Sequence, residues 1–184
     1  MILGLEGIDA SGKATQAKLL RERLTPRFNL VEVFDFPRYE SPAGALVGRI
    51  LRGETMIIDP GLVSEKFIDD DAGERLRTTW SLDKAMIIQC VMTVDRFEVV
   101  SKLASYEDDP DSLLILDRYH LSGIVYGQAD GLDRDWLYEI HTALPDPDLF
   151  IVLDIPVEES VRRRPERQDY YEKNPSAGYC RVVI

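Results

Sequence analysis

The 184-residue sequence has few cysteines, no long apolar run and no excess of positive charge. Its two cysteines, Cys90 and Cys180, form no disulfide framework and predict reduced thiols in a cytoplasmic setting. No apolar run reaches the ~18 residues that a membrane-spanning helix needs. The apolar run at residues 1–5 is short and meets Glu6 at once, so no signal peptide is expected.

Acidic residues outnumber basic ones by 33 to 22, which gives a formal charge of -11. The field of such a molecule repels phosphates, so non-specific binding of nucleic acids or anionic membranes is not expected. A phosphate-bearing ligand would therefore need a local pocket of arginine and lysine.

Short apolar segments alternate with helical patterns along the chain, as expected for one α/β domain. Continuous apolar strands between helices predict a parallel sheet covered on both faces, a three-layer α/β/α fold. Strands are expected at 2–5, 30–34, 112–116 and 149–153, and a fifth at 178–184. Helices are expected at 13–24, 43–51, 82–103, from 121, at 134–144 and at 158–164.

A glycine-rich segment, GIDASGK at residues 7–13, lies between the first strand and the first helix. In that context, backbone N–H groups and the helix N-terminus can hold phosphate oxygens; a glycine-rich turn without a ligand is the alternative. The predicted contacts are Gly7, Ile8, Asp9, Ala10, Ser11, Gly12, Lys13, Ala14 and Thr15.

Ala14 stands where such loops usually carry the serine or threonine that ligates Mg²⁺. The metal would then be held through water and phosphate oxygens, which Mg²⁺ tolerates because it dehydrates reluctantly. This substitution favours a nucleoside monophosphate kinase over a switch GTPase.

Two further segments follow strands, where ligands bind in parallel sheets. Phe36 and Pro37 are expected to form a rigid turn with an unusual peptide geometry, and Arg38 follows them. Asp117 and Arg118 follow the central strand. The alternative for the first segment is a core phenylalanine beside a surface arginine. The alternative for Asp117 and Arg118 is an ion pair that only caps the end of the strand.

Six segments occur in the order typical of one known family: EGIDASGKATQ (6–16), FPRY (36–39), DRF (95–97), LDRYHLSG (116–123), PDLFIVLDIP (147–156) and DYYE (169–172). In these segments the chain resembles the thymidylate kinases over essentially its whole length. The resemblance implies a single P-loop kinase domain over 1–184, with an arginine-rich lid at about 162–175. It also implies the reaction ATP + dTMP → ADP + dTDP with Mg²⁺. The acidic segment at about 52–82 is longer than the family pattern and is interpreted as an insertion or an interface.

The resemblance also assigns the acceptor side. It implies that Asp9 binds the 3′-hydroxyl of the sugar and contributes to the metal site, while Arg38 and Arg118 hold the acceptor phosphate. Asp117 would contact Mg²⁺ through water. The residues implied to surround base and sugar are Phe36, Pro37, Tyr39, Met92, Arg96, Ser122, Gly123 and Tyr126.

Two of these positions depart from the family pattern. Met92 replaces a phenylalanine that stacks on the base, and Gly123 offers no side chain where an amide or small residue is common. A kinase for another deoxynucleoside monophosphate, such as a 5-substituted dUMP, therefore stays an alternative. A kinase acting on nucleotides within DNA and a non-catalytic ATP-binding switch are two others; the negative charge and the acceptor-side residues oppose them.

The lid is expected to supply the catalytic arginine, because the loop at 7–13 contains none. Arg163, Arg164 and Arg167 are the candidates, beside Asp9, Lys13 and Arg118. Family members commonly form homodimers, and the helix around residues 87–100 is the expected interface.

Overall fold

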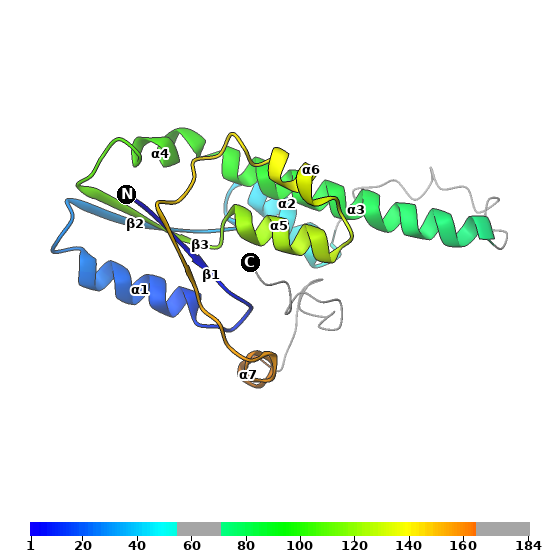
Figure 1. Ribbon diagram of the computed structural model, residues 1–184, viewed down its shortest axis with the longest axis horizontal. Coiled ribbons are helices and arrows are strands. Elements are labelled where there is room, and N and C mark those ends of the chain that lie inside the picture. The colour runs from blue at the N-terminus through cyan, green and yellow to red at the C-terminus, as the bar shows by residue number, and fades with distance from the viewer. Residues whose placement is uncertain (55–70, 165–184) are drawn as a thin grey trace.

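The computed structural model describes residues 1–54 and 71–164, with side chains described outside 71–83 (Figure 1). Its helices and strands alternate along the chain as the sequence predicts. They are β1 (Ile2–Glu6), α1 (Lys13–Leu24), β2 (Leu30–Asp35), α2 (Pro42–Leu51), α3 (Asp71–Phe97), α4 (Val100–Ser105), β3 (Ser112–Asp117), α5 (His120–Ala129), α6 (Arg134–Glu139), β4 (Leu149–Val152) and α7 (Val157–Arg163).

The four described strands form one parallel sheet in the order β2-β3-β1-β4. The predicted parallel α/β architecture is confirmed. The fifth strand expected at 178–184 lies outside the described residues.

Alternation along the strands divides the core between the two faces of the sheet, because successive side chains point to opposite sides. Leu3 and Leu5 of β1 pack with Ala17 of α1 on one face. Ile2 packs on the other face, with Leu103 of α4. Figure 1 shows α1 on one side of the sheet and α4, with the α2, α3 and α5 group, on the other. By this alternation Glu6 faces the α5 side.

Strand register brings the carboxyl ends of the strands to one edge. Leu5 is level with Asp117 of β3, and Asp117 is level with Asp35 of β2. The loop after β1, the turn after β2 and Asp117–Arg118 therefore share that edge, as expected for a ligand site in a parallel sheet.

The predicted helix at 82–103 differs from the structure. The helix α3 already begins at Asp71 and ends at Phe97, and α4 follows from Val100. Between them, the Glu98 carboxylate accepts a hydrogen bond from the Ala43 backbone N–H at 3.0 Å. This contact joins the turn to the start of α2 across 55 residues, so the apolar periodicity did not reveal the break.

Among the described residues, none of the helices combines the length and the apolar composition that crossing a bilayer requires.

Candidate active site

The loop between β1 and α1 is built on backbone conformations that favour glycine. Gly7 has φ 142° and Gly12 has φ 102°. A Cβ atom at Gly7 would lie 2.6 Å from the Leu153 carbonyl oxygen. Ala10 also has a positive φ, 58°, which costs an alanine about 1 kcal/mol.

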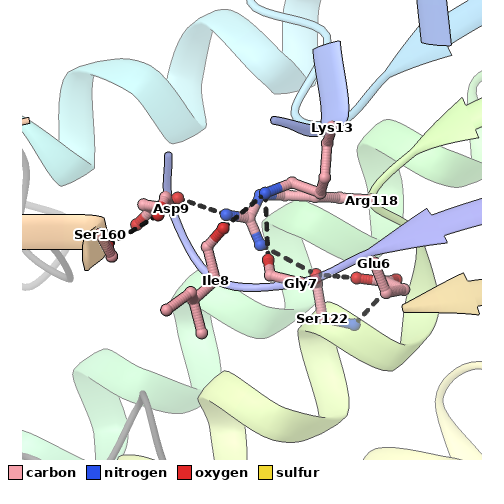
Figure 2. A network of polar contacts seen from close by, with 8 residues as sticks. All are labelled: Glu6, Gly7, Ile8, Asp9, Lys13, Arg118, Ser122 and Ser160. Atoms are coloured by element: carbon pink, nitrogen blue, oxygen red, sulfur yellow. Dashed lines mark hydrogen bonds and ion pairs between the residues drawn. The ribbon is translucent and has the colours of Figure 1, made fainter. Parts of the chain in front are cut away.

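Helix α7 stabilises this strained segment from outside. The Ser160 hydroxyl donates to the Asp9 carbonyl at 2.7 Å, and Arg163 Nη1 donates to the Ala10 carbonyl at 3.1 Å. Figure 2 shows Ser160 approaching the loop at Asp9. The base of the predicted lid is therefore attached to the loop that it is expected to cover.

Lys13 is buried inside the loop. Its Nζ donates to the carbonyl oxygens of Gly7 and Ile8, each at 3.0 Å (Figure 2). Burial lowers the pKa of Lys13 to about 8, and the Arg118 charge acts in the same direction, while nearby carboxylates oppose the shift. The ammonium group thus lies in a desolvated position where an anion would stabilise its charge.

Arg118 faces the loop from the end of β3. Its guanidinium forms an ion pair with the Asp9 carboxylate and donates to the Ser122 hydroxyl at 3.3 Å (Figure 2). It also lies over the Tyr126 ring, 5.6 Å from the centroid. Residues 109 apart in the chain thus meet in one polar network.

Glu6 organises the other side of this network, a role that the sequence did not reveal. The carboxylate is buried and accepts hydrogen bonds from Tyr119 N at 2.9 Å, Ser122 N at 3.3 Å and Ser122 Oγ at 2.6 Å. A negative charge at the N-terminus of α5 is also favoured by the helix dipole. The one signal in the sequence that could have indicated this role of Glu6 is an acidic residue at the end of an apolar strand, immediately before the loop.

The turn after β2 is held by a second buried acid. Asp95 of α3 is fully buried and accepts from Arg38 N at 2.8 Å and from Ser41 Oγ at 2.7 Å. Ser41 in turn caps α2. The Phe36–Pro37 bond in this turn is cis, which confirms the unusual peptide geometry expected there.

The structure does not bring the Arg38 side chain into the cleft. Its Nη1 lies 3.8 Å from the Glu98 carboxylate, and its guanidinium lies 5.9 Å from the centre of the Phe34 ring. Glu98 attracts the guanidinium, whose Nη1 is buried beside it. The acceptor-phosphate role of Arg38 stays a prediction.

Arg96 and Met92 of α3 form a more apolar end of the site. Arg96 is 3% exposed, donates through Nη2 to the Tyr119 carbonyl at 2.9 Å, and lies 6.0 Å from the centre of the Phe36 ring. Met92 is buried and packs in a cluster with Ile88 and Tyr126. This end can hold a flat ring with polar edges.

These groups line one cleft of about 420 Å³. It brings together most of the predicted residues, adds Asp35, Leu51 and Asp95, and includes Arg164 at the end of α7. The predicted residues that line it are Asp9, Ala10, Gly12, Lys13, Ala14, Thr15, Phe36, Pro37, Tyr39, Met92, Arg96, Asp117, Arg118, Ser122, Gly123, Tyr126 and Arg164.

The other predicted residues lie elsewhere. The carbonyls of Gly7 and Ile8 bind Lys13. Arg163 is occupied by the loop and by Glu159, to which its Nε donates at 2.7 Å. Arg167 lies outside the described residues, as do lid residues 165–175 and most of the acidic segment, residues 55–70.

The site suits phosphates and a hydrated cation. The Ser11 hydroxyl is buried in the loop without a hydrogen-bond partner in ranges 1–54 and 71–164. A bound anion could accept a hydrogen bond from it. Burial raises the pKa of Asp117, against the effect of Lys13 and Arg118. Within those ranges, no group of three or more His, Cys, Asp or Glu side chains could hold a metal directly. Asp117, Asp35 and Asp9 fit a hydrated cation that they would contact through water, with phosphate oxygens as direct ligands.

A loop with a buried lysine lies after the first parallel strand, and an arginine–carboxylate pair faces it from the end of the neighbouring strand. This arrangement defines a protein of the P-loop fold. Sequence comparison identifies its family. A family model described as thymidylate kinase matches residues 72–177. A probable thymidylate kinase of Pyrococcus horikoshii is 36% identical over 159 residues, which cover 86% of this chain and 67% of that protein. A probable thymidylate kinase of Thermococcus kodakarensis is 34% identical over 165 residues, 89% and 70% of the two chains. The chain belongs to the thymidylate kinase family.

Solved structures agree on the fold. Thymidylate kinase from Candida albicans superposes with a TM-score of 0.67 at 22% sequence identity. The superposition covers 100% of this chain and 78% of the Candida chain. Thymidylate kinase from Ehrlichia chaffeensis gives a TM-score of 0.58 at 23% identity, with 89% and 75% covered.

Glu6 gives a first test of the site. Replacement of Glu6 by alanine leaves three donors without their acceptor, so we expect the free energy of unfolding to fall by roughly 2–4 kcal/mol, measured by urea denaturation. Glu6→Gln keeps an acceptor oxygen and should cost less. Glu22→Ala, on the exposed side of α1, is the matched control. Equal stability of Glu6→Ala and Glu22→Ala would contradict the anchoring role.

Lys13 gives a second test, by pH. Bound phosphates favour the charged amine, so they raise a pKa that is about 8 in the free protein. At pH 9 the free amine is roughly nine-tenths neutral, and binding of an ATP analogue should take up nearly one proton and be about tenfold weaker than at pH 7. Calorimetry in buffers of different ionisation enthalpy measures the uptake. Lys13→Arg keeps the charge and should show none; equal uptake in both proteins rejects the assignment.

Proposed function

We propose that the protein transfers the γ-phosphoryl group of ATP to dTMP, giving ADP and dTDP, with Mg²⁺ as cofactor. The observation that carries the proposal is the shared cleft, which Lys13, Arg96 and Arg118 all line. A donor phosphate chain and an acceptor nucleotide that meet in one cleft need positive charges for both partners.

The donor end consists of the loop amides and Lys13, which contact the β- and γ-phosphates in the proposal. Arg164 lines the same cleft from the end of α7, and in the proposal it meets charge on the transferred group. The Arg163 contacts with Glu159 and Ala10 support a role in holding the loop instead.

The acceptor end consists of Arg118 for the phosphate and of Phe36, Met92 and Arg96 for the base. Arg118 binds Asp9 in the structure, and the acceptor phosphate shares or replaces this partner in the proposal. Arginine suits the position because its planar donors match phosphate oxygens. The acceptor phosphate is already ionised, so no general base is needed.

Mg²⁺ neutralises charge on the donor phosphates when bound. Asp117 and Asp9 would hold it through water, with Asp35 beside Asp117 in the strand register.

Turnover with a panel of monophosphates tests the proposal. We expect ADP release with dTMP, and Met92 and Gly123 in the cleft wall make 5-substituted dUMP the second candidate acceptor. Arg118→Ala should lose roughly 10²–10³-fold in turnover because the acceptor phosphate is no longer held in line, while ATP binding is retained. Arg49→Ala, exposed on α2, is the matched control. ATP binding without any acceptor-dependent release would favour the switch function.

We also propose a homodimer formed through α3. Met86, Val94 and Phe97 are 39%, 52% and 36% exposed, and with exposed Cys90 they recur every three or four residues on one side of the helix. An apolar stripe of this kind fits a second copy of itself. A cytoplasmic location belongs to the same proposal, since the exposed Cys90 thiol suits a reducing compartment.

Val94→Asp tests the dimer. A carboxylate in the middle of the stripe should convert the dimer to a monomer in sedimentation equilibrium, because two like charges would face each other. Lys84→Asp is the control that should leave the mass unchanged, because Lys84 is exposed two residues before Met86 and therefore on another side of α3. A dimer that persists in Val94→Asp would exclude this surface.

A further inference from the structure

The Arg96 guanidinium is a buried charge with few partners. Nη2 donates to the Tyr119 carbonyl, and Nη1 lies 3.5 Å from Nε2 of His141. Nε has no hydrogen-bond partner in the part of the chain that the structure describes. A charge at 3% exposure needs acceptors around it, so each of these two contacts matters for where the group lies.

The hydrogen bonds of His141 define which ring nitrogen can accept. His141 follows α6 and is 5% exposed. Its Nδ1 lies 2.7 Å from the Leu137 carbonyl, which can only accept, so Nδ1 carries the proton. In the neutral ring, Nε2 then presents a lone pair. Thr93 Oγ1 lies 3.1 Å from Nε2, but its hydroxyl donates to the Gln89 carbonyl at 2.8 Å. Arg96 Nη1 is therefore the donor that faces the lone pair.

Gly123 brings this imidazole directly behind the cleft wall. A Cβ atom at Gly123 would lie 3.1 Å from Cε1 and 3.2 Å from Nε2 of His141. Gly123 itself lines the cleft. The absence of a side chain therefore lets α5 approach the histidine, and the same glycine borders the cleft.

We propose that His141 is a positioning residue for base recognition. Its Nε2 and the Tyr119 carbonyl hold the Arg96 guanidinium from two sides, and this leaves the other N–H groups for a carbonyl oxygen on the base of the acceptor nucleotide. The cleft then favours an oxo-pyrimidine over an amino-pyrimidine, since an amino group offers no acceptor at that point. The choice of ligand rests on the proposed function; the His141–Arg96 contact does not.

The surroundings of the ring keep this acceptor available. Burial lowers the pKa of His141 to about 4, and Arg96 of α3 and His120 of α5 act in the same direction. The Leu137 carbonyl of α6 opposes the shift. His141 is therefore neutral at pH 7, and its lone pair faces the guanidinium instead of a second positive charge.

His141→Phe and His141→Gln test the proposal with the full chain. Phenylalanine keeps a ring but removes the acceptor, so we expect the KM for dTMP to rise about tenfold. The preference for dTMP over dCMP should fall by a similar factor, while the KM for ATP stays unchanged. Glutamine restores an acceptor and should recover most of both. In an Arg96→Ala background, His141→Phe should have no further effect on the KM for dTMP.

Equal effects of His141→Phe with and without Arg96 would overturn the proposal. So would a joint rise in both KM values with a lowered Tm, which indicates a role in the scaffold alone. If His141→Phe does not fold, the glutamine variant and the Arg96 background decide.

Nitrogen NMR of the wild-type imidazole gives a readout without turnover. A neutral ring protonated on Nδ1 at pH 7 supports the arrangement, and protonation on Nε2 overturns it. If the wild type phosphorylates no pyrimidine monophosphate, the proposed function fails, while this spectrum still decides whether His141 accepts from Arg96.

Discussion

The carboxylate of Glu6 is the constraint on which the site depends. It ends β1 inside the protein, where an unpaired charge would cost several kcal/mol, and it is stabilised by three donors from the start of α5. Those bonds fix α5 relative to the loop after β1. As a consequence, Arg118 and Ser122 lie opposite Lys13. The end of β1 thus carries the loop that contains Lys13 and also holds α5 in place through Glu6.

The same arrangement explains how an acidic molecule can bind phosphates. The chain carries a formal charge of -11, yet Lys13, Arg96, Arg118 and Arg164 gather in one cleft. Asp9 pairs with Arg118, and Asp117 lies close enough to Lys13 and Arg118 to influence both. Positive charge is thus concentrated in the cleft and held by neighbouring acids, although the net charge of the chain is negative.

Sequence alone predicted the parts of this structure that follow from local pattern. The loop at 7–13 and the strand ends at Asp117–Arg118 were placed correctly, because carboxyl ends of parallel strands must meet at one edge. Glu6, Asp95 and His141 were missed, since their roles depend on partners many residues away. The ion pair of Arg38 was missed for the same reason: its partner Glu98 lies in a helix break that periodicity did not indicate.

A crystal structure with dTMP and a non-hydrolysable ATP analogue tests the central claim most directly. The account expects the acceptor phosphate on Arg118, the base against Arg96 and Met92, and the analogue's terminal phosphate on Lys13. Binding of either nucleotide outside this cleft, with the Lys13 and Arg118 contacts unchanged, would contradict it.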